Sequence, residues 1–171
     1  MKADVVIVGA GVSGVPAAVA AARAGAQTLL IEQQGRPGGT MVNSLGFPVC
    51  GLFENDISNP PRLLNEGLSA EFLATVLAEV SDPVSAMGRV FVCRCPVLLF
   101  ESIYNHWLEE KNLTVCFGAT DLFLTKSADR IEEICFRTSD GILQTVEVGQ
   151  VVDCTGWGEV VQKCGAEKIV P

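Results

Sequence analysis

Apolar and polar positions alternate along the first thirty residues in blocks that predict a β-α-β arrangement. Residues 5–8 and 28–31 are short, largely apolar runs, typical of strands that are buried on both faces of a parallel sheet. Between them, residues 15–23 are rich in alanine and predict a helix, which Gly25 ends. These segments form one βαβ unit.

Helical spacing returns in the middle of the chain. Residues 68–80 and 97–111 each place apolar side chains on one helical face, which predicts two amphipathic helices. The glycine-rich stretch 36–51 predicts an irregular segment, and residues 90–94 predict a short strand. Residues 113–117 predict a third parallel strand.

From Ala119 onward the pattern becomes that of short strands. A further strand is expected to begin at Val151 and to end at Thr155 and Gly156. Before it, three strands joined by tight turns predict an antiparallel meander, at residues 122–124, 131–136 and 143–148. The predicted fold class is therefore α/β, with a central parallel sheet, helices on both faces and a small antiparallel meander.

The segment between the first strand and the first helix is the most informative motif. Residues 9–14 read Gly-Ala-Gly-Val-Ser-Gly and fit G-x-G-x-x-G, with an acid, Glu32, 18 residues after the last glycine. Gly9 allows the tight turn, Gly11 a close approach of backbone to a pyrophosphate, and Gly14 close helix packing. The helix N-terminus then offers free N–H groups to phosphate. The motif predicts a Rossmann-like dinucleotide-binding fold.

Glu32 is expected at the carboxyl end of the second strand. A carboxylate there accepts the ribose hydroxyls of an adenosine and repels a 2′-phosphate, which disfavours NADP. The alternative is a structural glycine turn with an incidental surface acid.

Residues 4–39 resemble the FAD-dependent oxidoreductases of the glutathione-reductase-like, two-dinucleotide-fold group. Within that group they are most similar to a family in which the acid is followed by a Gly-Gly turn, here Arg36-Pro-Gly-Gly-Thr40. The resemblance implies that this turn lies along the pyrophosphate and the ribityl chain of FAD. The alternative is a surface loop with two turn glycines.

A second signature of the family stands at residues 153–159, Asp-Cys-Thr-Gly-Trp-Gly-Glu, and Cys164-Gly-Ala166 also fits it. The resemblance implies that Thr155 and Gly156 approach the FAD phosphates, and that the backbone near Thr120 borders the adenine. Trp157 departs from the family, which usually has an acid there. The cofactor-binding residues expected from the motif and the resemblance are Gly9, Ala10, Gly11, Val12, Ser13, Gly14, Glu32, Gln33, Arg36, Gly38, Gly39, Thr40, Thr120, Thr155 and Gly156.

The family continues beyond its second signature with a substrate domain, whereas this chain ends at Pro171. We therefore expect one FAD-binding domain over residues 1–171, with an inserted helical and loop segment at about 44–96 and the substrate domain absent or carried by a partner subunit. The implied function is the FAD-binding domain or subunit of a flavin-dependent oxidoreductase. A non-catalytic nucleotide-binding module, a subunit of a split flavoenzyme and an NAD-binding domain remain alternatives.

Composition limits the kinds of molecule that the chain is expected to bind. The 171 residues are 49% hydrophobic and carry a net charge of −8, which disfavours nucleic acid and anionic membranes. No apolar run approaches the ~20 residues of a membrane span, and the start of the chain does not read as a signal peptide. The seven cysteines are an odd number in largely apolar settings, which predicts reduced thiols and a cytoplasmic protein.

Other reactive side chains give weak signals. His106 is the single histidine and is expected on a helix flank. Cys93 and Cys95 lack a second pair at zinc spacing, so buried strand thiols are favoured over a metal or redox site. Cys50 lies in a loop, where packing is favoured over a flavin contact. The catalytic residues are left unknown, since hydride chemistry belongs to the flavin itself.

Overall fold

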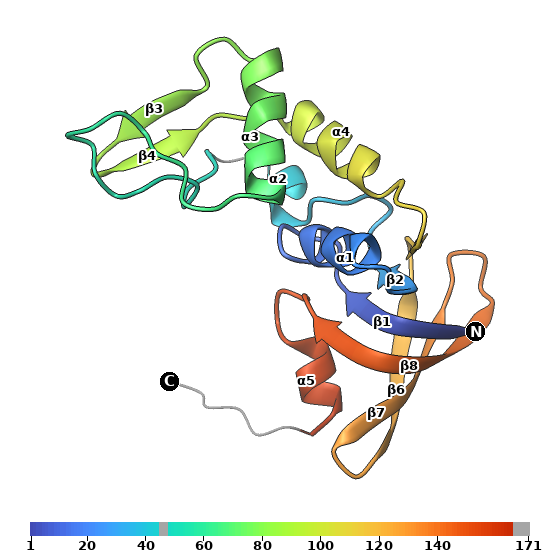
Figure 1. Ribbon diagram of the computed structural model, residues 1–171. Coiled ribbons are helices and arrows are strands. Elements are labelled where there is room, and N and C mark those ends of the chain that lie inside the picture. Colours follow the sequence, from blue (N-terminus) through green and yellow to red (C-terminus); the bar gives the residue numbers. More distant parts are fainter. Residues whose placement is uncertain (45–47, 166–171) are drawn as a thin grey trace. The chain divides into compact units, whose positions relative to one another are not determined.

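The computed structural model describes residues 1–44 and 48–165 (Figure 1). The chain divides into two units. Unit 1 consists of Met1–Gly39 and the chain from Tyr104 onward, and unit 2 consists of Thr40–Ile103.

Unit 1 is built on a six-stranded sheet. Its strands in chain order are β1 (Lys2–Val8), β2 (Thr28–Ile31), β5 (Leu113–Cys116), β6 (Thr120–Ser127), β7 (Arg130–Arg137) and β8 (Leu143–Asp153). The hydrogen-bonded order is β5-β2-β1-β8-β7-β6. The first four of these strands pair in parallel and the last three pair antiparallel. The expected α/β fold with a parallel sheet and a meander is confirmed.

Strand β8 belongs to both parts of the sheet. Residues 143–147 pair antiparallel with β7, and residues 147–153 pair in parallel with β1. The expectation of two separate strands, at 143–148 and from Val151, is therefore wrong. Gly149 lies between these two expected ranges, and a Cβ at this position would overlap the carbonyl of Asp4. The glycine lets β8 pass close to β1 without interruption.

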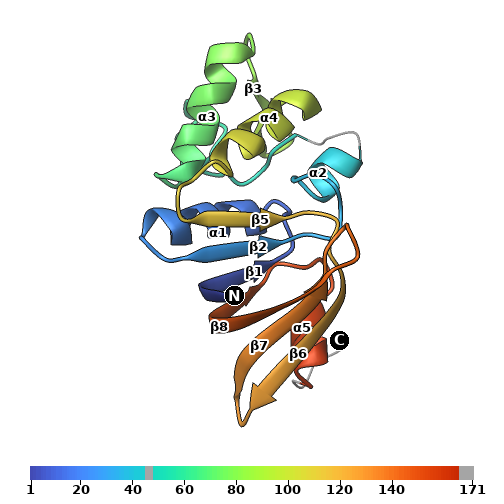
Figure 2. The same cartoon turned by 90° about the vertical axis from the view of Figure 1, so that its right-hand side faces the viewer.

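The sheet cannot be flat. Three residues, 117–119, join its two edge strands, β5 and β6. Four residue steps reach at most ~14 Å, whereas the outer strands of a flat six-stranded sheet lie about 24 Å apart. The sheet therefore curls, as Figure 2 shows, and the meander folds toward the parallel strands.

One helix packs against each face of the sheet. On one face Val6 and Val8 share a core cluster with Phe136 of the meander and with Val160 of helix α5 (Glu159–Lys163). Side chains alternate along a strand, so the fully buried Ile7 points to the other face. Helix α1 (Gly14–Arg23) contacts β1, β2 and β5 and buries its apolar side there.

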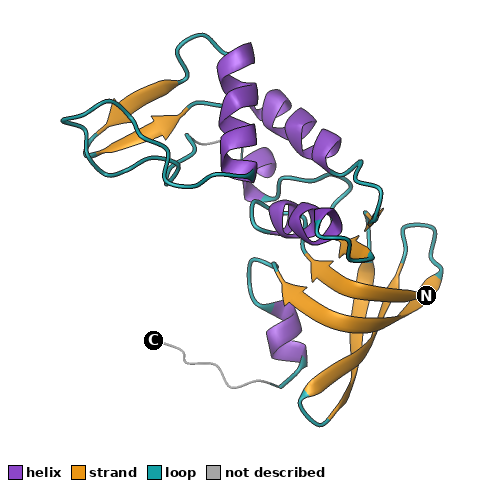
Figure 3. Cartoon of the chain, viewed as in Figure 1, coloured by secondary structure: helices purple, strands orange, loops and turns teal. Residues whose placement is uncertain are grey.

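Unit 2 contains helices and a hairpin (Figure 3). Phe72 packs edge-on against Phe100, with ring centroids 5.7 Å apart, and Phe53 packs similarly against Phe91. Its elements are α2 (Thr40–Asn43), α3 (Leu68–Glu79), β3 (Val84–Met87), β4 (Val90–Cys93) and the first residues of α4 (Val97–Trp107). Helix α4 ends four residues before the predicted end, because the chain leaves it through a tight turn in which Glu109 N–H donates to the carbonyl of His106.

Candidate functional site

The topology singles out one edge of the sheet in unit 1. From β1 the chain proceeds to β2 and then β5 on one side, whereas β8 returns on the other side of β1. The order of strands thus reverses between β1 and β8. In open α/β sheets, ligands bind at such a switch point, beyond the carboxyl ends of the strands. Residues 9–14 and 154–158 leave the sheet from these ends.

Two glycines of the first turn are required by the protein itself. Gly9 has φ +98°, and a Cβ there would lie 2.6 Å from the carbonyl oxygen of Cys154. A Cβ at Gly14 would overlap the carbonyl of Gly9. Any larger residue at either position would push apart the strand, the helix or the 154–156 segment. The shape of the turn therefore explains why these two residues are glycines, and neither of them indicates a ligand.

Gly11 is different. Its backbone lies outside the left-handed region, and a Cβ built on it would meet no atom within 4 Å. Gly156, after β8, has the same two properties. Neither glycine is needed for packing or for backbone conformation. The space in front of each is open, as close approach of a ligand to the backbone requires.

Glu32 is nearly buried, at 8% exposure, directly after β2. Its Oε2 accepts the N–H of Ala10 at 2.6 Å, and its Oε1 accepts the N–H of Gln34 at 2.7 Å. The side chain therefore ties the first glycine turn to the loop after β2. A carboxylate has about four acceptor positions, so both oxygens keep capacity for hydroxyl donors.

The loop after Glu32 also packs against the glycine turn. Gly38 has φ +106° and donates its N–H to the carbonyl of Ala10 at 2.8 Å. A Cβ on Gly39 would lie 2.9 Å from the Cα of Gly11. Gln33 and Arg36 are exposed on the same loop. Close backbone packing thus brings this loop beside Gly11.

The segment leading into β6 runs beside Glu32. Ala119 donates its N–H to the carbonyl of Glu32 at 2.9 Å, and Gly118 donates to the carbonyl of Gln34 at 3.0 Å. Thr120, the next residue, is exposed. The structure therefore brings Thr120 near the Glu32 loop within unit 1. Thr40 begins α2 and belongs to unit 2.

The polar groups of Thr155 are used inside its own turn. Its hydroxyl donates to Asp153 Oδ1 at 2.7 Å and accepts the N–H of Glu159 at 2.7 Å. Its N–H donates to the same carboxylate oxygen at 3.0 Å. Gly156 and Trp157 are exposed, the indole at 87%. Asp153 stood within the second signature, but its role as an acceptor could not be identified without the geometry of the turn.

A second residue that the sequence reasoning missed lies behind the first turn. Tyr104 is buried and stacks on Trp107, with ring centroids 5.5 Å apart. Its hydroxyl donates to the carbonyl of Val12 at 3.4 Å. Burial raises the pKa of Tyr104, so the hydroxyl stays a donor at neutral pH. Because the C=O and N–H of a trans peptide point in opposite directions, this contact turns the N–H of Ser13 away from Tyr104.

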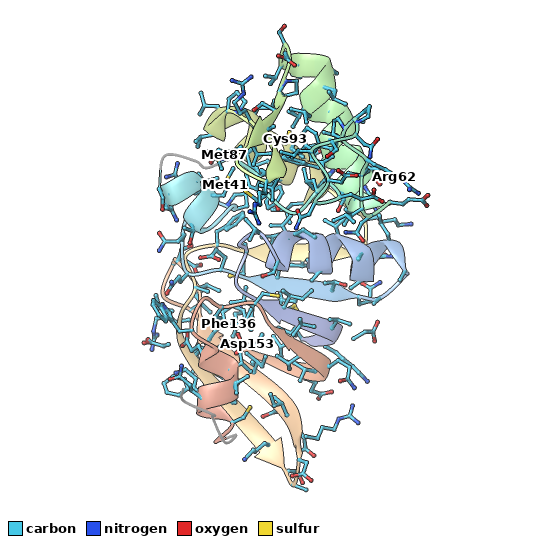
Figure 4. All side chains as sticks on the ribbon, turned by 90° about the vertical axis from the view of Figure 1, so that its left-hand side faces the viewer. Met41, Arg62, Met87, Cys93, Phe136 and Asp153 are labelled. Atoms are coloured by element: carbon cyan, nitrogen blue, oxygen red, sulfur yellow. The ribbon has the colours of Figure 1, made fainter. Side chains whose placement is uncertain are left out.

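The remaining reactive side chains lie in ordinary settings. His106 is 80% exposed and faces Glu109 at 3.3 Å. Cys93 (Figure 4) and Cys95 are buried, and desolvation raises the pKa of Cys93 and raises that of Cys95 to about 12. Cys50 is exposed, and Gly46 and Phe47 before it lie outside the described residues. Within residues 1–44 and 48–165, no cluster of His, Cys, Asp and Glu is arranged to hold a metal ion.

Comparison with known protein families identifies the chain. The model of the FAD dependent oxidoreductase family matches residues 4–170. The chain belongs to this family. Its cofactor is FAD, as the sequence predicted. No curated protein sequence gives a significant match.

Solved structures share the fold. THI4 of Thermovibrio ammonificans is 18% identical, with a TM-score of 0.64 over 97% of this chain and 64% of that protein. A flavoprotein/dehydrogenase of Cytophaga hutchinsonii is 16% identical, with a TM-score of 0.62 over 96% of this chain and 42% of that one. The 3-ketosteroid-delta4-(5alpha)-dehydrogenase of Rhodococcus jostii RHA1 is 17% identical, with a TM-score of 0.62 over 89% of this chain and 45% of that one.

The chain thus spans less than two thirds of each of these proteins. The fold is that of FAD-binding flavoproteins of Rossmann type, in agreement with the sequence-based prediction. In the described part of the chain, none of the helices combines the length and apolar character that crossing a bilayer requires.

Proposed function

We propose that this chain is the FAD-binding part of a flavin-dependent oxidoreductase and that the ADP half of FAD lies across the carboxyl ends of β1, β2 and β8. The observation that carries the proposal is the open space at Gly11, a glycine that nothing in the protein requires. It stands three residues before α1, whose N-terminal N–H groups and dipole favour a pyrophosphate. Family membership supplies the identity of the dinucleotide.

The residues around this space fit the chemistry of ADP. Glu32 would accept the ribose hydroxyls through acceptor positions that Ala10 and Gln34 leave open. Arg36, exposed on the adjoining loop, would pair with the pyrophosphate. Flavin supplies the electron-transfer chemistry once bound. The chain's own contribution is to bind the ADP end and to orient the cofactor.

The same residues predict selectivity among dinucleotides. A 2′-phosphate would place a dianion next to the buried carboxylate of Glu32. We therefore expect FAD to bind more tightly than NADP. The backbone near Thr120, with Gln33, would border the adenosine, and Thr40 would follow along the ribityl side.

We further propose that residues 1–171 form one FAD-binding domain in which the segment at about 44–96 is an insertion. A further domain or a partner subunit would cover the isoalloxazine ring and bind the substrate. In support of this, the chain spans only 64%, 42% and 45% of the three related structures, which each have further chain beyond the shared part. A cytoplasmic location is part of the proposal, since thiols such as Cys93 and Cys95 are buried as in proteins of reducing compartments.

The test is direct titration of the purified chain with FAD, NAD and NADP. Flavin absorbance after gel filtration reports retention, and quenching of the two tryptophans, Trp107 and Trp157, reports binding. The proposal expects FAD to bind most tightly. Tighter binding of NADP, or no binding of FAD at any concentration tested, would refute it.

A further inference from the structure

Asp153 is the last residue of β8 and pairs in register with Val8 of β1 (Figure 4). Its carboxylate gathers three donors. Oδ1 accepts the N–H of Thr155 at 3.0 Å and its hydroxyl at 2.7 Å. Oδ2 accepts the N–H of Val161 at 3.0 Å. One side chain thus joins the end of a strand, the turn that follows and the first turn of α5.

This carboxylate caps α5, although Asp153 lies five residues before the N-cap residue of the helix. The residue before α5 is Gly158, in the left-handed region at φ +65°, and it has no side chain to accept the free N–H groups. Partial burial acts to raise the pKa of Asp153, but the hydrogen bonds from Thr155 and Val161 outweigh it, so the pKa lies below its ordinary value. Asp153 is therefore charged at neutral pH, and its hydrogen bonds are charge-assisted.

The turn that Asp153 holds is packed directly on the first glycine turn. Cys154 donates its N–H to the carbonyl of Val8 at 2.8 Å. Its own carbonyl and the nitrogen of Thr155 lie 2.6 and 3.1 Å from where a Cβ of Gly9 would be. A shift of the 154–156 segment would therefore disturb the turn at Gly9 as well. Gly156, the next residue, faces the open space described above.

We propose that Asp153 is a positioning residue for the cofactor, which holds the 154–158 turn against the first glycine turn so that Gly156 and Gly11 face the nucleotide in fixed positions. This inference rests on the proposed function. The hydrogen bonds of Asp153 go to Thr155 and Val161. It acts by fixing the backbone before the ligand arrives, which removes the ordering cost from the binding step.

The test compares Asp153→Asn with Asp129→Asn. Asp129 lies exposed in the turn between β6 and β7, so its replacement makes the same change of charge away from the site. An asparagine at 153 keeps one oxygen and places an NH₂ group against a donor, so at least one charge-assisted hydrogen bond is lost. We expect the Kd of Asp153→Asn for FAD and for ADP to rise roughly tenfold, and that of Asp129→Asn to equal wild type.

Amide hydrogen exchange separates positioning from general stability. In Asp153→Asn without ligand, the amides of residues 155–161 should exchange faster, while those of β1 and β2 keep wild-type protection. FAD should restore part of the protection in 155–161. This readout does not depend on any enzymatic activity.

Each outcome is decisive. Wild-type affinity in Asp153→Asn overturns the inference and leaves the proposed function standing. Loss of protection throughout the sheet overturns it too, because Asp153 would then be a general determinant of folding. If the wild-type chain itself fails to bind FAD and ADP, the proposed function is at fault.

Discussion

Replacing Gly11 with alanine should stabilise the unliganded protein and at the same time weaken its binding of FAD. Opposite effects on the stability of the apoprotein and on the affinity for FAD make this a sharp test. The reason lies in the geometry of this position. A Cβ on Gly11 meets no protein atom within 4 Å, and the backbone is outside the region that favours glycine.

The two magnitudes can be worked out separately. Alanine restricts the unfolded chain, and where the native backbone accepts it the gain is about 0.4–1 kcal/mol, or ~1–4 °C in Tm for a chain of this size. With FAD present, the methyl group would fill the space where the pyrophosphate approaches the backbone. Loss of one charge-assisted hydrogen bond costs ~1.5–3 kcal/mol, which corresponds to roughly a 10- to 150-fold rise in Kd.

Thermal unfolding of the apoprotein and a fluorescence titration with FAD measure the two effects. Ala20→Val is a matched control, because it adds bulk at an exposed position of α1 away from the turn. It should leave the affinity for FAD unchanged. Gly11→Ala with wild-type affinity would show that the space is not used by the cofactor. A fall in the Tm of the apoprotein would show that the protein itself needs this glycine.

Three further predictions concern the residues around the site. Glu32→Gln should lower the free energy of unfolding by about 1–3 kcal/mol and weaken FAD binding, because its NH₂ group would face a backbone donor. Unchanged values in denaturant titration and FAD titration would contradict the role of Glu32 in joining the glycine turn to the loop after β2. Tyr104→Phe should raise the Kd for FAD about two- to tenfold, since one neutral hydrogen bond is lost, and equal affinities would exclude a role of the hydroxyl. Cys50 should react with a thiol reagent at pH 8 in the folded protein, whereas Cys93 and Cys95, with raised pKa values, should react only after unfolding; mass spectrometry showing label on Cys95 of the native protein would count against this.

Much of the fold could be predicted because the signals are local. The parallel strand at 28–31 was predicted with its observed bounds, and the helix over 15–23 with an error of one residue. Apolar runs and periodicity act within a few residues, so they can be recognised without knowledge of tertiary contacts. A tight turn was likewise expected between the strands at 131–136 and 143–148, and Gly141 in that connection has φ +85°.

The elements that the sequence did not predict correctly depend on contacts between distant parts of the chain. The strands expected at 143–148 and from Val151 are a single strand, because Gly149 lets β8 pass β1 at Asp4, a residue 145 positions away. Strand β3 (Val84–Met87) and the five-residue helix α5 are too short for periodicity to identify. Helix α5 is held by tertiary contacts, since Asp153 accepts one of its N–H groups and Val160 packs in the core of the sheet. The sequence motif pointed to the location of the site, but the partners that hold the two turns follow from the three-dimensional arrangement.

The glycines support the proposed position of the ligand without reference to any family. Most described glycines either have a positive φ or would clash if given a Cβ, so the protein's own structure explains them. Among the described residues, those with an ordinary φ and open space in front of the Cα are Gly11, Gly35 and Gly156. They follow β1, β2 and β8, the three neighbouring strands at the switch point. Topology predicts a ligand at that edge, and unexplained glycines mark where backbone must stay uncovered. Because these two arguments use independent features of the chain, their agreement supports a nucleotide site there more strongly than the G-x-G-x-x-G motif alone.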